Sequence, residues 1–271
     1  MLKVKVRKRL TPEEYRRRPW FTEKVARRIS IYFTWLFLQL GLSANQVSFF
    51  VFILGVFSGI AFIWGNFLLA ALILQCWYLT DAVDGEIARY HGVDDLTGAY
   101  TDKLMHYLIE GWIFYSIGMG LAGKLEIYWI CYVGLWVTFF FTFLKLIYDL
   151  KYNCFVTQAQ FSKKAENFLI KKVEEKDLPD NCLRERVLKT YSLYPNVMNI
   201  ITVAVLLDYF WRGFQWMGLT WSLLLMLLFS YMLFYPVACL KGLYLIISER
   251  KIDKEYEEIL TSDTHNNVKD I

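Results

Sequence analysis

The chain has 271 residues, of which 56% are hydrophobic and only 21% charged, with a mean hydropathy of +0.31 and a formal net charge of +4. A soluble enzyme covers its surface with more polar residues than this, so the composition excludes a soluble globular protein and also a disordered chain. The five cysteines form no C-x-x-C pair, which excludes a disulfide scaffold. Long apolar runs separated by short basic blocks indicate a helical protein that crosses a membrane several times.

The first 45 residues are predicted to lie on the membrane surface. They are basic, and Pro12 and Pro19 interrupt them, so we expect no cleavable signal peptide. Between Phe21 and Leu40, apolar residues recur at helical spacing beside basic ones, which predicts an amphipathic helix against anionic lipid. Its apolar positions are Val25, Ile29, Tyr32, Leu36 and Leu40. The following segment, Ser43-Ala44-Asn45-Gln46, has the pattern of a capping box that starts a helix.

Six apolar runs come next, each close to the roughly 20 residues that a helix needs to cross a bilayer. They are Gln46–Trp64, Phe67–Ala88, Ala99–Leu121, Glu126–Leu150, Pro195–Trp211 and Leu219–Ile247. The predicted fold class is therefore an all-α integral membrane protein with six transmembrane helices and an N-terminal amphipathic interfacial helix. We expect a cytoplasmic basic segment at 1–45, a membrane domain at 46–248 with a cytoplasmic loop at 151–193, and a cytoplasmic tail at 249–271.

The distribution of positive charge predicts the orientation. An even number of spans places both termini on one side of the membrane, and 28 of the 30 Lys and Arg residues fall on that side. Only Lys124 and Arg212 fall on the other side. Because cytoplasmic segments carry the excess of Lys and Arg, both termini and the long loop are predicted to be cytoplasmic in a multi-pass protein.

The second and third runs contain charged residues that an apolar span should not have. Asp81 and Asp84 are one helical turn apart and share a face of the second run. On the third run Gly98, Asp102, His106 and Glu110 recur at every fourth residue and share a face as well. Both faces lie near the cytoplasmic ends of their helices and a short loop joins them, so we expect them to meet.

Converging carboxylates within a membrane need a partner, a water-filled cavity or a metal ion, because each costs a few kcal/mol at the bilayer centre. Arg89 and Lys103 are the only basic residues close by in the sequence, which favours a divalent cation. Carboxylate oxygens suit Mg²⁺ or Mn²⁺, which act mainly on phosphate oxygens. On spacing alone, a proton relay or a structural ion pair explains these residues equally well.

The order of these residues is that of a known motif. It runs Asp81-x-x-Asp84-Gly85-x-x-Ala88-Arg89, then eight residues, then Gly98-x-x-x-Asp102-x-x-x-His106. This pattern resembles the signature D-x-x-D-G-x-x-A-R-x8-G-x3-D-x3-D of the CDP-alcohol phosphotransferase family, also called the CDP-alcohol phosphatidyltransferase family, and matches seven of its eight positions. The six-helix layout extends the resemblance over most of the chain, apart from the long loop and the tail.

The resemblance implies an enzyme of phospholipid synthesis that displaces CMP from a CDP-linked donor with the hydroxyl of an alcohol acceptor, using one or two Mg²⁺ or Mn²⁺ ions. It implies metal binding by Asp81, Asp84, Asp102 and His106. It implies that the nucleotide lies against Gly85, Ala88, Gly98 and Asp84, and that Arg89 supports the phosphates. A homodimer working on membrane lipid is expected by resemblance, with no nucleic acid as partner. The identities of donor and acceptor stay open.

The departure from the motif is His106, which stands where the family has a fourth aspartate. Three hypotheses follow. An imidazole is a competent base near neutral pH, and Glu110 one turn further on is placed to orient it. Alternatively, His106 is a ligand that changes the number or kind of bound ions. In the third hypothesis, the chain binds CDP without turnover and has a regulatory or scaffolding role.

Two other classes of membrane protein remain as alternatives. Prenyltransferases also use paired aspartate motifs with Mg²⁺, but nothing in their chemistry requires the Gly and Ala-Arg positions found here. A transporter would carry its charged residues midway across the membrane rather than at one end.

Overall fold

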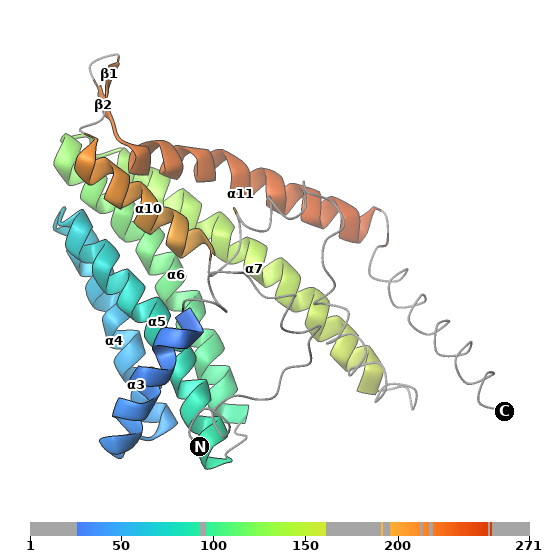
Figure 1. The fold of residues 1–271 in the computed structure, drawn as a ribbon. Helices are drawn as coiled ribbons and strands as arrows, with labels where there is room; N and C mark the ends of the chain where they lie inside the picture. The colour runs from blue at the N-terminus through green and yellow to red at the C-terminus, as the bar shows by residue number, and fades with distance from the viewer. Residues whose placement is uncertain are drawn as a thin grey trace. The chain divides into compact units, whose positions relative to one another are not determined.

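The computed structural model describes residues 26–92, 96–160, 191, 196–211, 214–216, 219–248 and 250. The described elements are the helices α3 (Arg27–Gln39), α4 (Ala44–Ile63), α5 (Phe67–His91), α6 (Leu96–Leu125), α7 (Ile130–Gln160), α10 (Asn196–Phe210) and α11 (Leu223–Ile247), and the strands β1 (Phe214–Trp216) and β2 (Leu219–Trp221), as Figure 1 shows. The chain divides into two compact units. The first comprises Met1–Thr138 and Asp180–Met232, and the second comprises Phe139–Pro179 and Leu233–Ile271.

Four of the described helices are long and apolar enough to cross a membrane: α4, α5, α7 over Ile130–Lys151, and α11. The helix α10 is apolar but has only 15 residues. The helix α6 has 30 residues, but acidic and basic side chains in its first half lower its mean hydropathy. A helical chain with membrane-length apolar helices is therefore confirmed, whereas the count of six spans stays a prediction.

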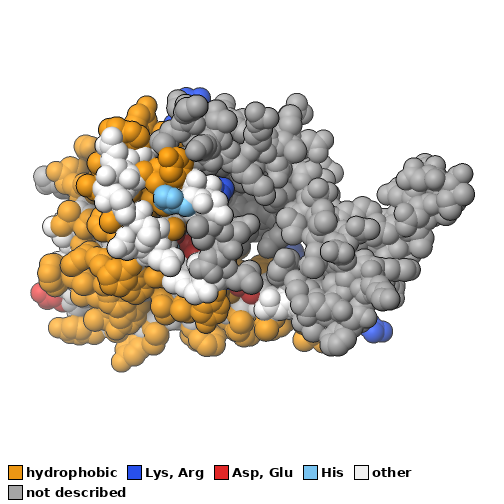
Figure 2. Space-filling model, turned by 90° about the horizontal axis from the view of Figure 1, so that it is seen from below, with side chains coloured by type: hydrophobic (Ala, Val, Ile, Leu, Met, Phe, Trp, Pro, Cys, Tyr) orange, Lys and Arg blue, Asp and Glu red, His pale blue; other side chains and the backbone are white. Residues whose placement is uncertain are grey.

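Hydrophobic side chains cover most of the described surface in the view of Figure 2. Large exposed side chains occur on all of the membrane-length helices, for example Phe57 on α4, Leu72 on α5, Phe139 on α7 and Leu240 on α11. A water-exposed protein rarely presents so much contiguous apolar surface, whereas a lipid-exposed surface is expected to do so.

The start of the first predicted span is confirmed. The Ser43 side chain accepts a hydrogen bond from the Gln46 backbone N–H, and the Gln46 side chain accepts one from the Ser43 backbone N–H at 2.9 Å. This reciprocal arrangement is the capping box, which satisfies backbone donors that the first turn of a helix leaves without partners.

The predicted start of the last span at Leu219 is wrong. Residues Leu219–Trp221 instead pair with Phe214–Trp216 as a short antiparallel hairpin within an otherwise helical set of described elements. At the start of α11 the Asp208 carboxylate accepts the backbone N–H groups of Leu223 and Leu224, at 2.6 and 2.8 Å, and the Ser222 hydroxyl accepts that of Leu225 at 3.2 Å. A carboxylate at this position caps the helix and complements its dipole.

The fourth predicted span is shifted and longer in the structure. The helix α7 starts at Ile130 rather than Glu126, because Glu126 adopts a left-handed backbone conformation with φ of 58°. It continues to Gln160, ten residues beyond the predicted end at Leu150, so the first part of the predicted loop at 151–193 is helical. Most of that loop, the basic residues 1–25 and nearly all of the tail lie outside the described residues.

Glycines allow α4 and α6 to lie in close contact. A Cβ atom on Gly59 of α4 would lie 1.9 Å from the indole nitrogen of Trp112, which itself donates a hydrogen bond to the Val56 carbonyl at 3.2 Å. A Cβ atom on Gly120 of α6 would lie 2.0 Å from the Phe62 carbonyl oxygen. Small residues at such crossings are the usual device by which membrane helices approach one another. They fix α6 beside α4 in the first unit, with α5 packed against α4 as well.

The short helix α3 packs against α5 in the same unit (Figure 1). Its buried residues are the polar Ser30 and Thr34 and the apolar Ile31, and Ala26 just before the helix is buried as well. The predicted apolar positions Ile29, Tyr32, Leu36 and Leu40 are exposed, and Val25 lies outside the described residues. An apolar face turned away from the protein fits the predicted interfacial helix.

Candidate active site

The candidate site lies where the second half of α5 meets the first half of α6. The helix α5 ends at His91, and Gly92 follows in the left-handed conformation with φ of 69°, which closes the helix through hydrogen bonds to the last carbonyls. The chain returns in α6, which starts at Leu96. The polar faces of both helices are brought together, as the spacing of the carboxylates predicts.

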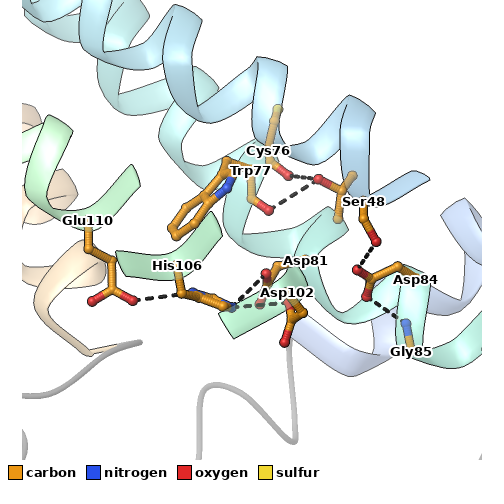
Figure 3. A network of polar contacts seen from close by, with 10 residues as sticks. Ser48, Cys76, Trp77, Asp81, Asp84, Gly85, Asp102, His106 and Glu110 are labelled. Carbon is orange, nitrogen blue, oxygen red and sulfur yellow. Dashed lines mark hydrogen bonds and ion pairs between the residues drawn. The ribbon is translucent and has the colours of Figure 1, made fainter. Parts of the chain in front are cut away.

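His106 occupies the centre of this cluster (Figure 3). Its Nε2 lies 3.0 Å from Oδ1 of Asp81 on α5 and 3.6 Å from Oδ1 of Asp102 on its own helix. Its Nδ1 lies 3.2 Å from Oε1 of Glu110, so the predicted contact between these two residues is present. Carboxylates only accept hydrogen bonds, so an imidazolium that donates from both nitrogens satisfies this arrangement.

Burial increases steadily through the cluster. The Asp102 side chain is 48% exposed and the Glu110 side chain is fully buried, with Asp81 and His106 between them. The ring of Trp77 approaches the imidazole edge-on, with centroids 5.7 Å apart. Asp102 therefore forms the open end of the cluster, and Glu110 fixes the imidazole from the interior.

Asp84 points to a different partner from Asp81. Its Oδ2 accepts a hydrogen bond from the Ser48 hydroxyl at 2.6 Å, and its Oδ1 accepts the Gly85 backbone N–H at 2.6 Å (Figure 3). Ser48, which comes from α4 and is 36 residues from Asp84, was not predicted from the sequence. The available signal was a hydroxyl one turn into the first span, next to its predicted cytoplasmic end.

A small cavity connects these residues. It has a volume of about 10 Å³ and is lined by Ser48, Val51, Phe52, Trp77, Asp81, Asp84, Asp102, Met105 and His106. This volume accommodates about one water-sized occupant. Asp84 thus faces the same cavity as the His106 cluster although its carboxylate is bonded to Ser48.

The residues predicted to contact a nucleotide lie near the end of α5 and at the start of α6. The guanidinium of Arg89 lies over Gly85, where a Cβ atom would be only 3.2 Å from Nη1. Ala88 is half-buried and Arg89 exposed on the same stretch of α5, and Gly98 is half-buried in the first turns of α6. Gly85, Ala88 and Gly98 are not among the described residues that line the cavity. A nucleotide at these glycines would therefore lie outside the small cavity, beside it.

The residues present fit one divalent cation. One ligand atom from each of Asp81, Asp102 and His106 lies within 4.8 Å of the others, and carboxylate oxygen with imidazole nitrogen is a set that Mn²⁺ and similar ions accept. The Asp84 carboxylate is not part of this group of three. Its predicted role as a ligand stays a prediction.

Comparisons with known proteins bear on the identity of this site. No curated protein matches the chain. The chain is similar in fold to a solved structure described as the crystal structure of Mycobacterium tuberculosis phosphatidylinositol phosphate synthase (PgsA1) with CDP-DAG bound, with a TM-score of 0.54 over 80% of this chain and 92% of that one. The two sequences are 16% identical, so this similarity concerns the fold. The family model described as CDP-alcohol phosphatidyltransferase matches residues 42–172, which include α4, α5 and α6 with the whole motif. The resemblance predicted from the motif is therefore confirmed as a match of residues 42–172 to the model of the CDP-alcohol phosphatidyltransferase family.

Proposed function

We propose that this chain is an integral membrane phosphotransferase that moves a substituted phosphate from a CDP-linked donor to an alcohol acceptor and releases CMP, within phospholipid synthesis. The observation that carries the proposal is the convergence of Asp81, Asp102 and His106 from two helices at the positions of the family motif. Further support comes from the fold shared with a synthase whose solved structure has CDP-DAG bound.

The proposal includes six spans and a cytoplasmic site. The helix α6 is long enough to cross a bilayer at about 1.5 Å per residue, and α10 crosses if the bilayer is locally thinned or its flanking residues contribute. The distribution of Lys and Arg supports a cytoplasmic location of the termini, α3 and the Asp81 cluster.

Each residue of the cluster has a role in this proposal. Asp81 and Asp102 would hold Mg²⁺ or Mn²⁺, with Asp84 as a further ligand by resemblance, and the ion when bound neutralises phosphate charge. The acceptor oxygen forms a bond to the donor phosphorus, the anhydride bond to the CMP phosphate breaks, and CMP leaves. When an ion balances Asp81 and Asp102, the imidazole of His106 would be neutral with its proton on Nδ1 toward Glu110, and the hydroxyl proton passes to the unprotonated Nε2. We assign His106 the role of base because Glu110 already fixes its Nδ1, and one nitrogen cannot both bind an ion and take a proton.

The test is release of CMP by the purified protein in lipid nanodiscs, offered a panel of CDP-linked donors and alcohols. We expect release that requires Mg²⁺ or Mn²⁺, stops on chelation, and falls by at least about a thousandfold in Asp102→Ala, since loss of a metal ligand removes most of the catalysis. Lys103→Gln, the neighbouring exposed residue, is the matched control and should keep most activity. A protein that binds CDP yet releases no CMP with any pair would contradict the proposal.

A second candidate function is a CDP-binding homologue without catalysis, which regulates or scaffolds lipid synthesis. The observation in its favour is that His106 lies between Asp81 and Asp102, where an imidazolium would neutralise both carboxylates without any ion. The variant His106→Asp restores the family motif and separates the two functions. Activity gained by His106→Asp from an inert parent would identify the homologue without catalysis, whereas an active parent that loses turnover in His106→Asp supports His106 as the base.

A further inference from the structure

A second buried carboxylate lies next to the candidate site and has no role in the motif. Glu86 of α5 is only 4% exposed and follows Gly85 directly. Its Oε1 accepts the Ser30 hydroxyl at 2.9 Å and its Oε2 accepts the Thr34 hydroxyl at 2.5 Å. Both hydroxyls come from α3, one turn apart, so each oxygen of one carboxylate is bound to the same face of the interfacial helix.

This contact is a polar link between α3 and α5 that is made entirely by buried groups. A carboxylate buried without donors is costly, so its two hydrogen bonds oppose separation of the helices more strongly than bonds between neutral groups would. Ser30 and Thr34 are themselves fully buried, and exchange of one donor for water would require α3 to lift from α5.

Apolar packing also holds α3, since the Phe37 ring meets the Phe50 ring of α4 edge-on with centroids 5.9 Å apart. Of its apolar side chains, Ala26 and Ile31 are buried, whereas Tyr32 is 70% and Trp35 49% exposed. The large side chains are thus directed away from α5, as in a helix that presents them to lipid. The buried side of α3 is the one that carries Ser30, Ile31 and Thr34.

We propose that Glu86 is a positioning residue that docks the interfacial helix α3 on α5 and thereby sets the depth at which the Asp81–Asp84 face meets lipid-embedded substrate. The part that concerns substrate rests on the proposed function, whereas the docking does not. Glu86 lies two residues after Asp84 on the same helix, so α3 bound to the membrane surface holds this turn of α5 at the surface as well.

The docking is tested by hydrogen exchange of the α3 amides in nanodiscs. The variant Ser30→Ala/Thr34→Val removes both donors at nearly unchanged volume, and Thr34→Ser keeps a hydroxyl. Thr80→Val is the matched control, because the Thr80 hydroxyl is equally buried on α5 but bonds only carbonyls of its own helix in the described structure. We expect exchange of α3 to accelerate roughly tenfold or more in the double variant and to remain near the parent rate in the other two. Unchanged exchange in the double variant would overturn the docking, and Thr34→Ser decides the question if the double variant does not fold.

The effect on substrate is tested with CDP-diacylglycerol as the lipid-embedded ligand and CDP as the soluble one. We expect the double variant to raise KM for CDP-diacylglycerol several-fold while kcat and the affinity for CDP stay within twofold. Equal losses with both ligands would indicate general damage and overturn the positioning role. If the parent releases no CMP, the proposed function fails separately, and the dissociation constants of CDP-diacylglycerol and CDP in nanodiscs replace KM in the same comparison.

Discussion

Ser48 determines the direction in which the Asp84 carboxylate points. The hydroxyl has one proton to donate, and its 2.6 Å contact with the Asp84 carboxylate is shorter than its 3.1 Å contact with the Ala44 carbonyl, so α4 contributes to the site although the family motif lies entirely on α5 and α6. A hydrogen bond to a charged group contributes about 1.5–3 kcal/mol. Without the Ser48 hydrogen bond, the Asp84 carboxylate would rotate toward other partners in the cavity.

The variant Ser48→Ala should therefore lower CMP release about tenfold or more, because Asp84 loses the bond that orients it. Ser48→Thr keeps a hydroxyl and should retain most activity. Ser58→Ala is the matched control on the same helix, since Ser58 bonds the Ala70 carbonyl far from the cluster. Turnover in Ser48→Ala equal to that in Ser58→Ala would contradict the orienting role.

At the scale of elements, the crossing of α4 and α6 determines where Asp102, His106 and Glu110 lie. Backbone contacts cannot be relieved by a change of rotamer, so Gly120 against the Phe62 carbonyl tolerates no side chain, whereas Gly123 has nothing within 4 Å of its Cβ position. Packing thus excludes a side chain at Gly120 but leaves space for one at Gly123, three residues further along the same helix.

We expect Gly120→Ala to lower the free energy of unfolding by about 1–3 kcal/mol or to shift α6, because an inserted methyl group overpacks the crossing. Gly123→Ala should leave stability unchanged or raise it slightly, since alanine favours a helix over glycine. Thermal unfolding of both variants in the same detergent makes the comparison. A Gly120→Ala protein as stable as Gly123→Ala would show that the crossing is looser than described.

At the scale of the molecule, the number of spans decides on which side each connection lies. With six spans and cytoplasmic termini, Gly123 at the end of α6 lies outside and Ser248 after α11 lies in the cytoplasm; if α10 does not cross, both positions lie on the same side. If α6 does not cross, the alternation of sides shifts for every later helix.

Single-cysteine variants Gly123→Cys and Ser248→Cys, made in a background without the native cysteines, test the six-span topology. Both positions are exposed in the structure. A membrane-impermeant maleimide added to intact cells should label position 123, and label position 248 only after permeabilisation. Labelling of both or neither in intact cells would contradict six spans with cytoplasmic termini.

Much of the candidate site was predictable because it follows helical periodicity. Asp81 on one helix and Asp102, His106 and Glu110 on the next were expected to meet, and all four do. The contacts of Asp84 and Glu86 with hydroxyls of other helices were not predicted. Ser48 and Ser30 are 36 and 56 residues from their partners, and a hydroxyl in a helix has no pattern that identifies its partner.

Fold boundaries were predictable where a local side chain specifies them. Ser43 and Gln46 mark the start of α4 in the sequence itself. The start of α11 has a local cap in Ser222, whose hydroxyl accepts the Leu225 N–H at 3.2 Å, and a second one in Asp208, which is 15 residues before Leu223 and belongs to another helix. An apolar run such as Leu219–Trp221 reads equally well as helix or strand, so only the tertiary contact decides.

The Asp208 cap has a consequence for the hairpin between α10 and α11. Both oxygens of one carboxylate define the first residue of α11, so the register of this long helix does not depend on how many residues β1 and β2 contain. The hairpin lies at the other end of the first unit from α3 (Figure 1). The hairpin is therefore a suitable site for inserting an epitope or a rigid fiducial for imaging. We expect a longer or shorter turn there to leave the first residue of α11 unchanged.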